Sequence, residues 1–212
     1  MTKERKFILK DLGLMDYEEI AVRMKSFNEE RGEETEDEIW VLEHNSVYTY
    51  GVSTDLKNIP AQLPYPVLST DRGGKITYHG PGQLVVYILM DFHRASIKPR
   101  EFIRKFQSSI FKTVSSYCKG FILNEDEAGI FFKDQKVASF GLKMTKSGSY
   151  HGAAINHNMN LDAWNEIVIC GNPDHHAIDL RSIGVSIDRD ELIGEVKKNI
   201  LLEFESQILK AS

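Results

Sequence analysis

The chain has 212 residues, 42% of them hydrophobic, and a formal net charge of -5. This length fits one compact α/β domain, and the sequence contains neither an apolar run of roughly 18 residues that could span a membrane nor the apolar segment of a signal peptide. The acidic balance argues against a nucleic-acid binder, because phosphate contacts need a basic surface. We therefore expect a single domain over residues 1–212, in a cytoplasmic protein that acts without nucleic acid or membrane.

The first half of the chain predicts one helix and several short strands. The helix begins near Asp16, which forms a capping-box-like pair with Glu19, and apolar side chains recur along one face from Tyr17 to Phe27. Runs rich in β-branched and aromatic residues predict strands at 39–42, 47–50, 67–69 and 84–90.

The second half predicts two further helices around a hairpin and a longer strand. A helix covers 99–120, and a hairpin joins 130–132 to 137–142. Alternation of apolar and polar residues over 153–161 predicts a strand with one exposed face. A last helix spans 189–209, with apolar residues at every fourth position. We therefore expect a mixed sheet flanked by helices.

The most unusual stretch is RGGKITYHGPGQ at 72–83, which directly precedes an apolar strand. Its glycines expose backbone N–H groups that could hold a carbonyl or phosphoryl oxygen, while Arg72 supplies charge and His79 a hydrogen bond. The spacing matches neither of the usual mononucleotide and dinucleotide cradles. Composition alone favours a ligand-binding loop over a tight structural loop and leaves the ligand open.

Cys118 and Cys170 are the only cysteines of the chain. Two cysteines are too few for a disulfide scaffold and lack the spacing of a zinc site, so we expect free thiols. Cys118 lies near the end of a predicted amphipathic helix and is interpreted as a packing residue. The histidines show no H-E-x-x-H pattern, so no metal site is expected.

Residues 72–91, RGGKITYHGPGQLVVYILMD, closely resemble the signature R-G-G-x-x-T-x-H-x-P-G-Q of the lipoyl(octanoyl) transferase family. The resemblance covers residues 42–171 and implies the fold of the biotin and lipoate protein ligase catalytic domain. That fold is α/β (α+β), with a mixed, mostly antiparallel sheet flanked by helices. Further similar segments are LEHNSVYTYG at 42–51, KVASFGLK at 136–143, HGAAIN at 151–156 and ICG at 169–171.

The same resemblance implies an acyltransferase that needs no cofactor. Such an enzyme takes an octanoyl group from acyl carrier protein and gives it to a specific lysine of a lipoyl domain, the first step of endogenous protein lipoylation. The implied acceptors are 2-oxoacid dehydrogenase subunits and the glycine-cleavage H protein.

Transferred residue by residue, the resemblance makes Cys170 the nucleophile and Lys136 its catalytic partner. A thiolate attacks well and also leaves well, and a neighbouring ammonium group stabilises it. The two residues lie far apart in sequence, so they meet only if the hairpin strand and the later loop adjoin. The implied substrate-binding residues are Arg72, Gly73, Gly74, Lys75, Ile76, Thr77, Tyr78, His79, Ser139, Phe140, Gly141, Gly152, Ala153 and Ala154, supported by Gly80, Gly82, Gln83, His151 and Gly171.

One departure and two alternatives accompany this interpretation. Where the family usually has a proline before the cysteine, this chain has Ile169, so we expect a changed approach to Cys170. An ATP-dependent ligase that activates free lipoate or biotin on the loop at 72–79 shares the implied fold but does not need Cys170. A non-catalytic acyl-binding protein is the third hypothesis.

Overall fold

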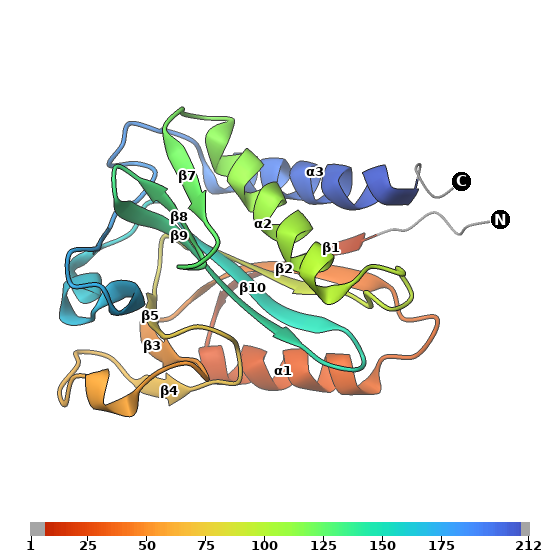
Figure 1. Ribbon diagram of the computed structural model, residues 1–212, viewed down its shortest axis with the longest axis horizontal. Coiled ribbons are helices and arrows are strands. Elements are labelled where there is room, and N and C mark those ends of the chain that lie inside the picture. Colours follow the sequence, from red (N-terminus) through yellow and green to blue (C-terminus); the bar gives the residue numbers. More distant parts are fainter. Residues whose placement is uncertain (1–6, 209–212) are drawn as a thin grey trace.

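The computed structural model describes the backbone of residues 7–208 and the side chains of residues 7–204. Its main sheet is mixed and mostly antiparallel, as predicted (Figure 1). Among the described residues of this main sheet, only the β1–β2 and β9–β11 pairs are parallel. The order along the sheet is β1 (Phe7–Met15), β2 (Asp37–His44), β6 (Gln83–Leu89), β10 (Ser149–Asn156), β9 (Gln135–Met144), β8 (Gly129–Phe132) and β7 (Phe121–Asn124), and the short β11 (His176–Ala177) pairs with β9.

Helices cover both faces of this sheet. Helices α2 (Pro99–Ser115) and α3 (Arg189–Ile208) lie on one face, and α1 (Tyr17–Glu30) lies on the other (Figure 1). Alternate residues of β6 divide between the two cores: Val86 packs with the α2 and α3 side chains, whereas Val85 packs with the α1 side chains. The sheet is thus buried on both faces. Among the described residues, no helix combines the length and apolar character that crossing a bilayer requires.

A second, smaller sheet forms beside α1. It has the order β4 (Val67–Ser69), β3 (Val47–Tyr50) and β5 (Ile76–His79). Three single-turn 3-10 helices accompany it, and Trp164 and Ile169 from two of them pack with Tyr48 and Tyr78 in a third apolar cluster. The glycine-rich stretch is therefore not all loop, because it contains β5. The 3-10 helices are η1 (Leu56–Asn58), η2 (Asp162–Glu166) and η3 (Ile169–Gly171).

The three predicted helices are present, with differences at their ends. Asp16 is the N-cap residue of α1 but makes no side-chain cap bond, because its carboxylate accepts from Asn45 Nδ2 at 2.6 Å instead. The predicted capping box is therefore wrong. Helix α2 ends at Ser115 and does not continue to Gly120. The predicted end of the third helix at Leu209 lies outside the described residues.

The predicted strand over 153–161 is wrong in its bounds and its exposure. Strand β10 covers Ser149–Asn156, and every residue of it is buried. The alternation of apolar and polar residues predicts one solvent-exposed face. However, β10 lies inside the sheet between β6 and β9, and packed side chains cover both of its faces. After Asn156 the chain turns away, and the amides of His157 and Asn158 donate to the carbonyl of Gly82.

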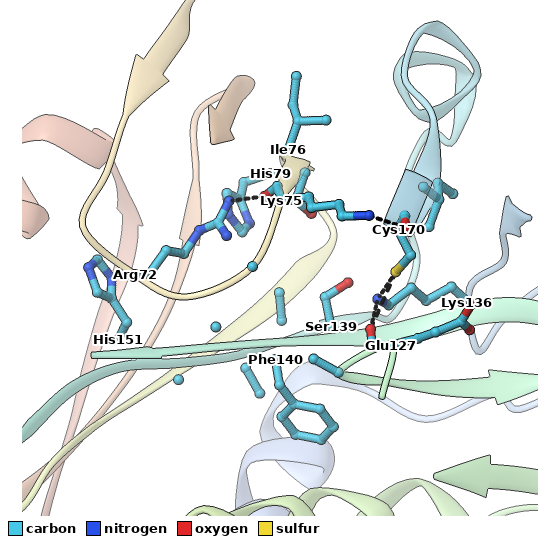
Figure 2. A pocket seen from close by; sticks show the side chains of 18 of the residues that line it. Arg72, Lys75, Ile76, His79, Glu127, Lys136, Ser139, Phe140, His151 and Cys170 are labelled. Atoms are coloured by element: carbon cyan, nitrogen blue, oxygen red, sulfur yellow. Dashed lines mark hydrogen bonds between the residues drawn. The ribbon is translucent and has the colours of Figure 1, made fainter. Parts of the chain in front are cut away.

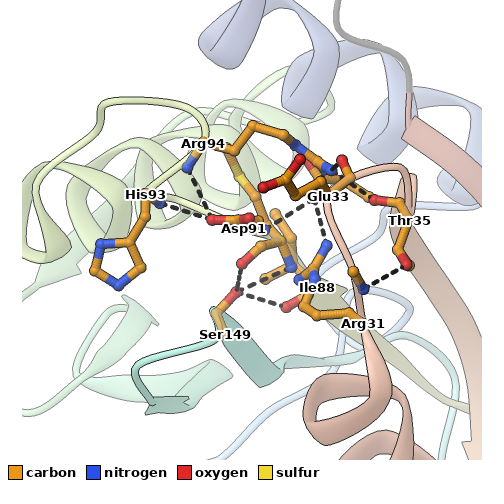
Figure 3. Close-up of polar contacts among 11 residues, drawn as sticks. Arg31, Glu33, Thr35, Ile88, Asp91, His93, Arg94 and Ser149 are labelled. Atoms are coloured by element: carbon orange, nitrogen blue, oxygen red, sulfur yellow. Dashed lines mark hydrogen bonds and ion pairs between the residues drawn. The ribbon is translucent and has the colours of Figure 1, made fainter.

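A buried charge cluster joins the end of α1, the start of β2 and the segment after β6 (Figure 3). Asp37 Oδ1 accepts from Arg31 Nη2 at 2.7 Å, from Arg94 Nη2 at 2.8 Å and from the backbone amide of Asp91 at 2.8 Å. Arg94 also donates to the carbonyl of Thr35 at 2.8 Å. The Arg31 side chain is 3% exposed and that of Asp37 is 1% exposed, so both charges depend on each other for compensation.

Asp37→Ala is expected to lower the free energy of unfolding by about 3–5 kcal/mol, because it leaves the buried Arg31 guanidinium without its counter-charge. Urea denaturation measures the change. Lys198→Ala is the control, since Lys198 is 62% exposed in its pair with Glu195 and should cost less than about 1 kcal/mol. Equal losses in the two variants would contradict the expectation.

Candidate active site

A cavity of about 340 Å³ lies between the main sheet and the glycine-rich segment. Its walls come from β5 and the loop before it, from β9 and β10, and from η3 (Figure 2). Apolar residues such as Ile76, Val85 and Ala154 line it beside a few polar ones. A site of this size suits a small ligand.

Cys170 lies in η3 with φ 55° and ψ 12°, a left-handed conformation that is costly for a residue with a β-carbon. Gly171 follows with φ 76°, so two successive residues make the turn. The ammonium group of Lys75 donates to the carbonyl of Cys170 at 2.9 Å and ties η3 to the glycine-rich loop. The positive φ of Gly171 favours glycine, and a β-carbon there would lie 2.6 Å from that ammonium group, so the lysine would have to move.

Lys136 reaches the cavity because β9 is irregular. In an unbroken strand it would share a face with Ala138, a core residue. The register between β8 and β9 shifts at this point, and the bulge turns Lys136 to the face on which Ser139 lines the cavity. Gly129 on β8 leaves room for the side chain, since a β-carbon there would lie 2.3 Å from Lys136 Cε.

Lys136 and Cys170 meet at the cavity wall (Figure 2). Lys136 Nζ is 2.9 Å from Cys170 Sγ. Both groups also contact the backbone carbonyl of Glu127, at 3.0 Å from Nζ and 3.3 Å from Sγ. The Glu127 carbonyl thus accepts from the Lys136 amino group and from the Cys170 thiol, and it holds the two groups side by side.

Arg72 shapes the glycine-rich loop from inside. Its guanidinium donates to Thr49, both carbonyl and hydroxyl, and to the carbonyls of Gly73 and Lys75 at 2.8–3.0 Å. Burial lowers the pKa of Arg72 from its ordinary value, although an arginine stays charged in this range. These bonds hold the loop in place, so Arg72 acts on the cavity through the loop's shape.

Another part of the cavity wall carries His151, which has φ 60° within β10. Its Nε2 lies 3.1 Å from Asp71 Oδ1, and the Tyr150 hydroxyl bonds the other oxygen of the same carboxylate. These hydrogen bonds, that of His151 foremost, hold the pKa of Asp71 well below its usual range. Burial lowers the pKa of His151, so a neutral imidazole donates its Nε2 proton to Asp71.

The neighbouring wall holds further uncharged rings. His79 is buried, its Nδ1 lies 2.7 Å from Gln83 Oε1, and Tyr17 stacks on it with ring centroids 6.0 Å apart. Burial lowers the pKa of His79 well below the usual range and lowers the pKa of His44, which bonds the Tyr87 hydroxyl, to about 4. The Nδ1 proton of neutral His79 goes to Gln83, which leaves Nε2 as an acceptor. His79 is therefore unsuited to donate a hydrogen bond to an oxyanion.

Residues 16–204 match the model of the lipoyl protein ligase A/B catalytic domain. The chain belongs to this family. An octanoyltransferase of Nitrosomonas eutropha is 34% identical over 201 residues, covering 95% of this chain and 89% of that protein. An octanoyltransferase of Pseudomonas entomophila is 37% identical over 184 residues, covering 87% and 86%. This member of the lipoyl protein ligase A/B family is thus an acyltransferase.

Solved structures show the same fold. A bi-partite lipoate protein ligase from Thermoplasma acidophilum aligns with a TM-score of 0.69 at 12% identity, covering 94% of this chain and 83% of that one. A lipoate-protein ligase A bound with ATP aligns with a TM-score of 0.66 at 12% identity, covering 95% and 85%. The expected ligase-like fold is confirmed.

Most of the predicted site residues line the cavity between the main sheet and the glycine-rich segment. Those that the structure brings together there are Arg72, Gly74, Lys75, Ile76, Thr77, His79, Lys136, Ser139, Phe140, Gly141, His151, Gly152, Ala153, Ala154 and Cys170. The other predicted residues, all within the described part of the chain, lie outside the cavity lining: Gly73, Tyr78, Gly80, Gly82, Gln83 and Gly171.

The predicted residues outside the lining pack against it or hydrogen-bond to residues that line it. The Tyr78 side chain joins the third apolar cluster, and its hydroxyl lies 2.9 Å from Ser46 Oγ. Gln83 links His79 to Asn156 through its side-chain amide. A β-carbon at Gly82 would lie 1.9 Å from the carbonyl oxygen of Asn158, so this glycine is needed for close backbone contact.

Several lining residues were missed by the sequence analysis. Helix and strand periodicity placed Tyr17, Val85 and Tyr87 in the core, and an alternating strand gives no sign of which face borders a cavity. Glu127 contributes its backbone carbonyl, and the residue type gives no signal for this role because every residue has such a group. The missed lining residues are Tyr17, Ser53, Val85, Tyr87, Asp126, Glu127, Ala128 and Trp164, whereas Ile169, named beforehand as a departure from the family pattern, also lines the cavity.

Proposed function

We propose that the chain is a single catalytic domain that works in the cytoplasm and transfers an octanoyl group from acyl carrier protein to a lysine of a lipoyl domain, through a thioester on Cys170. The contact of Lys136 Nζ with Cys170 Sγ at 2.9 Å, on the wall of a small and largely apolar cavity, carries the proposal. The curated relatives bear the name octanoyltransferase. The archaeal ligase of the same fold belongs to a lipoylation system together with its E2 lipoyl domain.

In the first half-reaction the Cys170 thiolate attacks the carbonyl carbon of the carrier thioester. The new C–S bond forms as the bond to the carrier sulfur breaks, and the Lys136 ammonium group gives a proton to the departing thiolate. This step leaves an octanoyl thioester on Cys170, a neutral Lys136 and a free carrier thiol.

In the second half-reaction the neutral amine of the acceptor lysine attacks the Cys170 thioester. Lys136 takes a proton from the attacking nitrogen as the amide forms, and Cys170 leaves as a thiolate. Both residues return to their starting charge states, so the cycle needs neither ATP nor a cofactor. The acceptors in this proposal are lipoyl domains of 2-oxoacid dehydrogenase subunits and the glycine-cleavage H protein.

The protein incubated with octanoyl-acyl carrier protein and a lipoyl domain, without ATP, is expected to add one octanoyl group to the lipoyl domain. Intact mass spectrometry measures the product, and a lipoyl domain whose acceptor lysine is replaced by arginine should stay unmodified. Transfer that requires free octanoate and ATP would instead identify a ligase. Binding of the acyl carrier without any transfer would identify an acyl-binding protein.

A further inference from the structure

We infer that Val85 on β6 closes the far end of the cavity and determines the length of the acyl chain that the protein accepts. This role rests on the proposed function, because it takes the thioester carbon of the substrate to lie at Cys170. It adds to that function the residue that decides between octanoyl and longer chains. Val85 lines the cavity and is 1% exposed.

The floor of the cavity is formed by small residues on β9 and β10. Ser139 on β9 pairs with Ala154 on β10, and Gly141 pairs with Gly152 further along the same two strands. All four residues line the cavity. Because these side chains are short or absent, a hydrocarbon chain can lie close to the backbone of both strands.

The floor ends at β6, where the side chains become larger. Ala154 pairs with Val85, and Gly152 pairs with Tyr87. Val85 and Tyr87 both line the cavity. The partner of Val85 on its other side is Leu42 of β2, which packs with the α1 side chains and is not among the lining residues. The row of paired residues thus passes from small side chains on β9 and β10 to a branched side chain on β6.

The residues beside Val85 are held by their own contacts. The Tyr87 hydroxyl lies 2.8 Å from His44 Nε2. Tyr17 stacks on His79, and its ring centroid is 5.1 Å from that of His44. Val85 is the aliphatic member of this group, so the methyl end of an acyl chain can pack against it without displacing a hydrogen bond. Its β-branched side chain also has a restricted χ1 angle, which makes it a firm boundary.

The glycine-rich loop closes the cavity along β9. Arg72 lies against Gly141, where a β-carbon would be 2.9 Å from Arg72 Cδ. The amide of Gly73 donates to the carbonyl of Leu142 at 3.0 Å, which fixes the loop to β9 at the next residue. An acyl chain that starts at Cys170 therefore runs across the strands, from β9 toward β6.

The width of the sheet between the two ends of the cavity fits an eight-carbon chain. Cys170 Sγ contacts the carbonyl of Glu127, shortly before β8. Strands β8 and β6 are three strand spacings apart, roughly 14 Å in all. An extended octanoyl chain is about 9 Å long, because each carbon–carbon bond of about 1.5 Å advances it by about 1.25 Å. The bond to sulfur and a contact of about 4 Å between the methyl end and Val85 occupy the remaining length.

The test measures how well straight-chain acids protect Cys170 from alkylation by iodoacetamide, in a Cys118→Ser background that leaves one thiol to react. Hexanoate, octanoate and decanoate are compared by the concentration that halves the alkylation rate. Val85→Ala is expected to raise the preference for decanoate over octanoate about tenfold, because the removed methyl groups leave space for a longer chain. Val85→Ile fills the same space and is expected to shift the preference from octanoate to hexanoate.

Val86→Ala is the matched control. Val86 is the next residue of β6 and is also buried, but it packs on the opposite face with the α2 and α3 side chains and is not among the lining residues. Its truncation should lower the thermal midpoint as Val85→Ala does and leave the preference among the three acids unchanged. Val85→Ile tests the same boundary without a loss of volume if Val85→Ala does not fold.

A preference that stays at the parent value in the Val85 variants, or that shifts equally in Val86→Ala, would overturn the role of Val85. Protection by free acids needs neither an acyl carrier nor an acceptor. If octanoyl transfer fails in the parent protein while the preference among the acids follows Val85, the proposed function is wrong and the boundary at Val85 remains. If transfer succeeds, kcat/KM for decanoyl relative to octanoyl carrier protein should rise in Val85→Ala, and an unchanged ratio would contradict the inference.

Discussion

Cys170→Ala is expected to abolish the acyl-enzyme and to lower octanoyl transfer by about 10⁴-fold or more, because it removes the sulfur that takes the acyl chain in the proposed mechanism. After incubation with octanoyl-acyl carrier protein, intact mass measurement should show one hydroxylamine-labile octanoyl group on the parent protein. The variant should show none. The cavity itself should survive, since alanine fits the space of the cysteine.

Cys118→Ser is the matched control for this experiment. Cys118 lies beyond the end of α2, and its thiol contacts the carbonyl of Lys119 at 3.3 Å rather than any group of the cavity. The variant should form the acyl-enzyme at the parent rate. A labile octanoyl group that persists in Cys170→Ala, or that disappears in Cys118→Ser, would place the nucleophile elsewhere.

Much of the fold was predictable because periodicity reports on burial. The helices near 17–30, 99–115 and 189–208 were predicted from apolar spacing, and the hairpin from its two β-rich runs. Strand β10 shows the limit of the method. A period of two says that successive side chains point to opposite faces, but only the neighbouring strands and helices decide whether both faces are covered.

The site was less predictable, for two physical reasons. The sequence spacing of Cys170 and Lys136 did not show that the two side chains meet. Their roles were inferred from the family resemblance. The bulge that turns Lys136 into the cavity depends on how β9 registers against β8, which is a property of two strands together. The contact of the Glu127 carbonyl with both side chains could not be predicted, because every residue has a backbone carbonyl. Its direction depends on the turn, in which Ala128 has a left-handed conformation.

Lys136→Arg is expected to reduce octanoyl transfer by about 10²–10⁴-fold, the usual contribution of general acid–base catalysis. The guanidinium keeps the positive charge beside Cys170 but does not give up its proton, so it cannot alternate between acid and base. The end of the lysine side chain also packs closely on Gly129, where a β-carbon would lie 2.3 Å from Lys136 Cε and 2.8 Å from Nζ, so the broader guanidinium group would be crowded. Steady-state transfer to a lipoyl domain measures the loss.

Lys136→Met separates the charge of the lysine from its proton transfer. Methionine removes both, so alkylation of Cys170 by iodoacetamide at neutral pH should be slower in Lys136→Met than in Lys136→Arg, where a cation still favours the thiolate. Transfer should be defective in both variants, because neither side chain can accept the proton of the incoming amine. Parent-level transfer in Lys136→Arg would show that a fixed charge is sufficient and that the proton moves by another route.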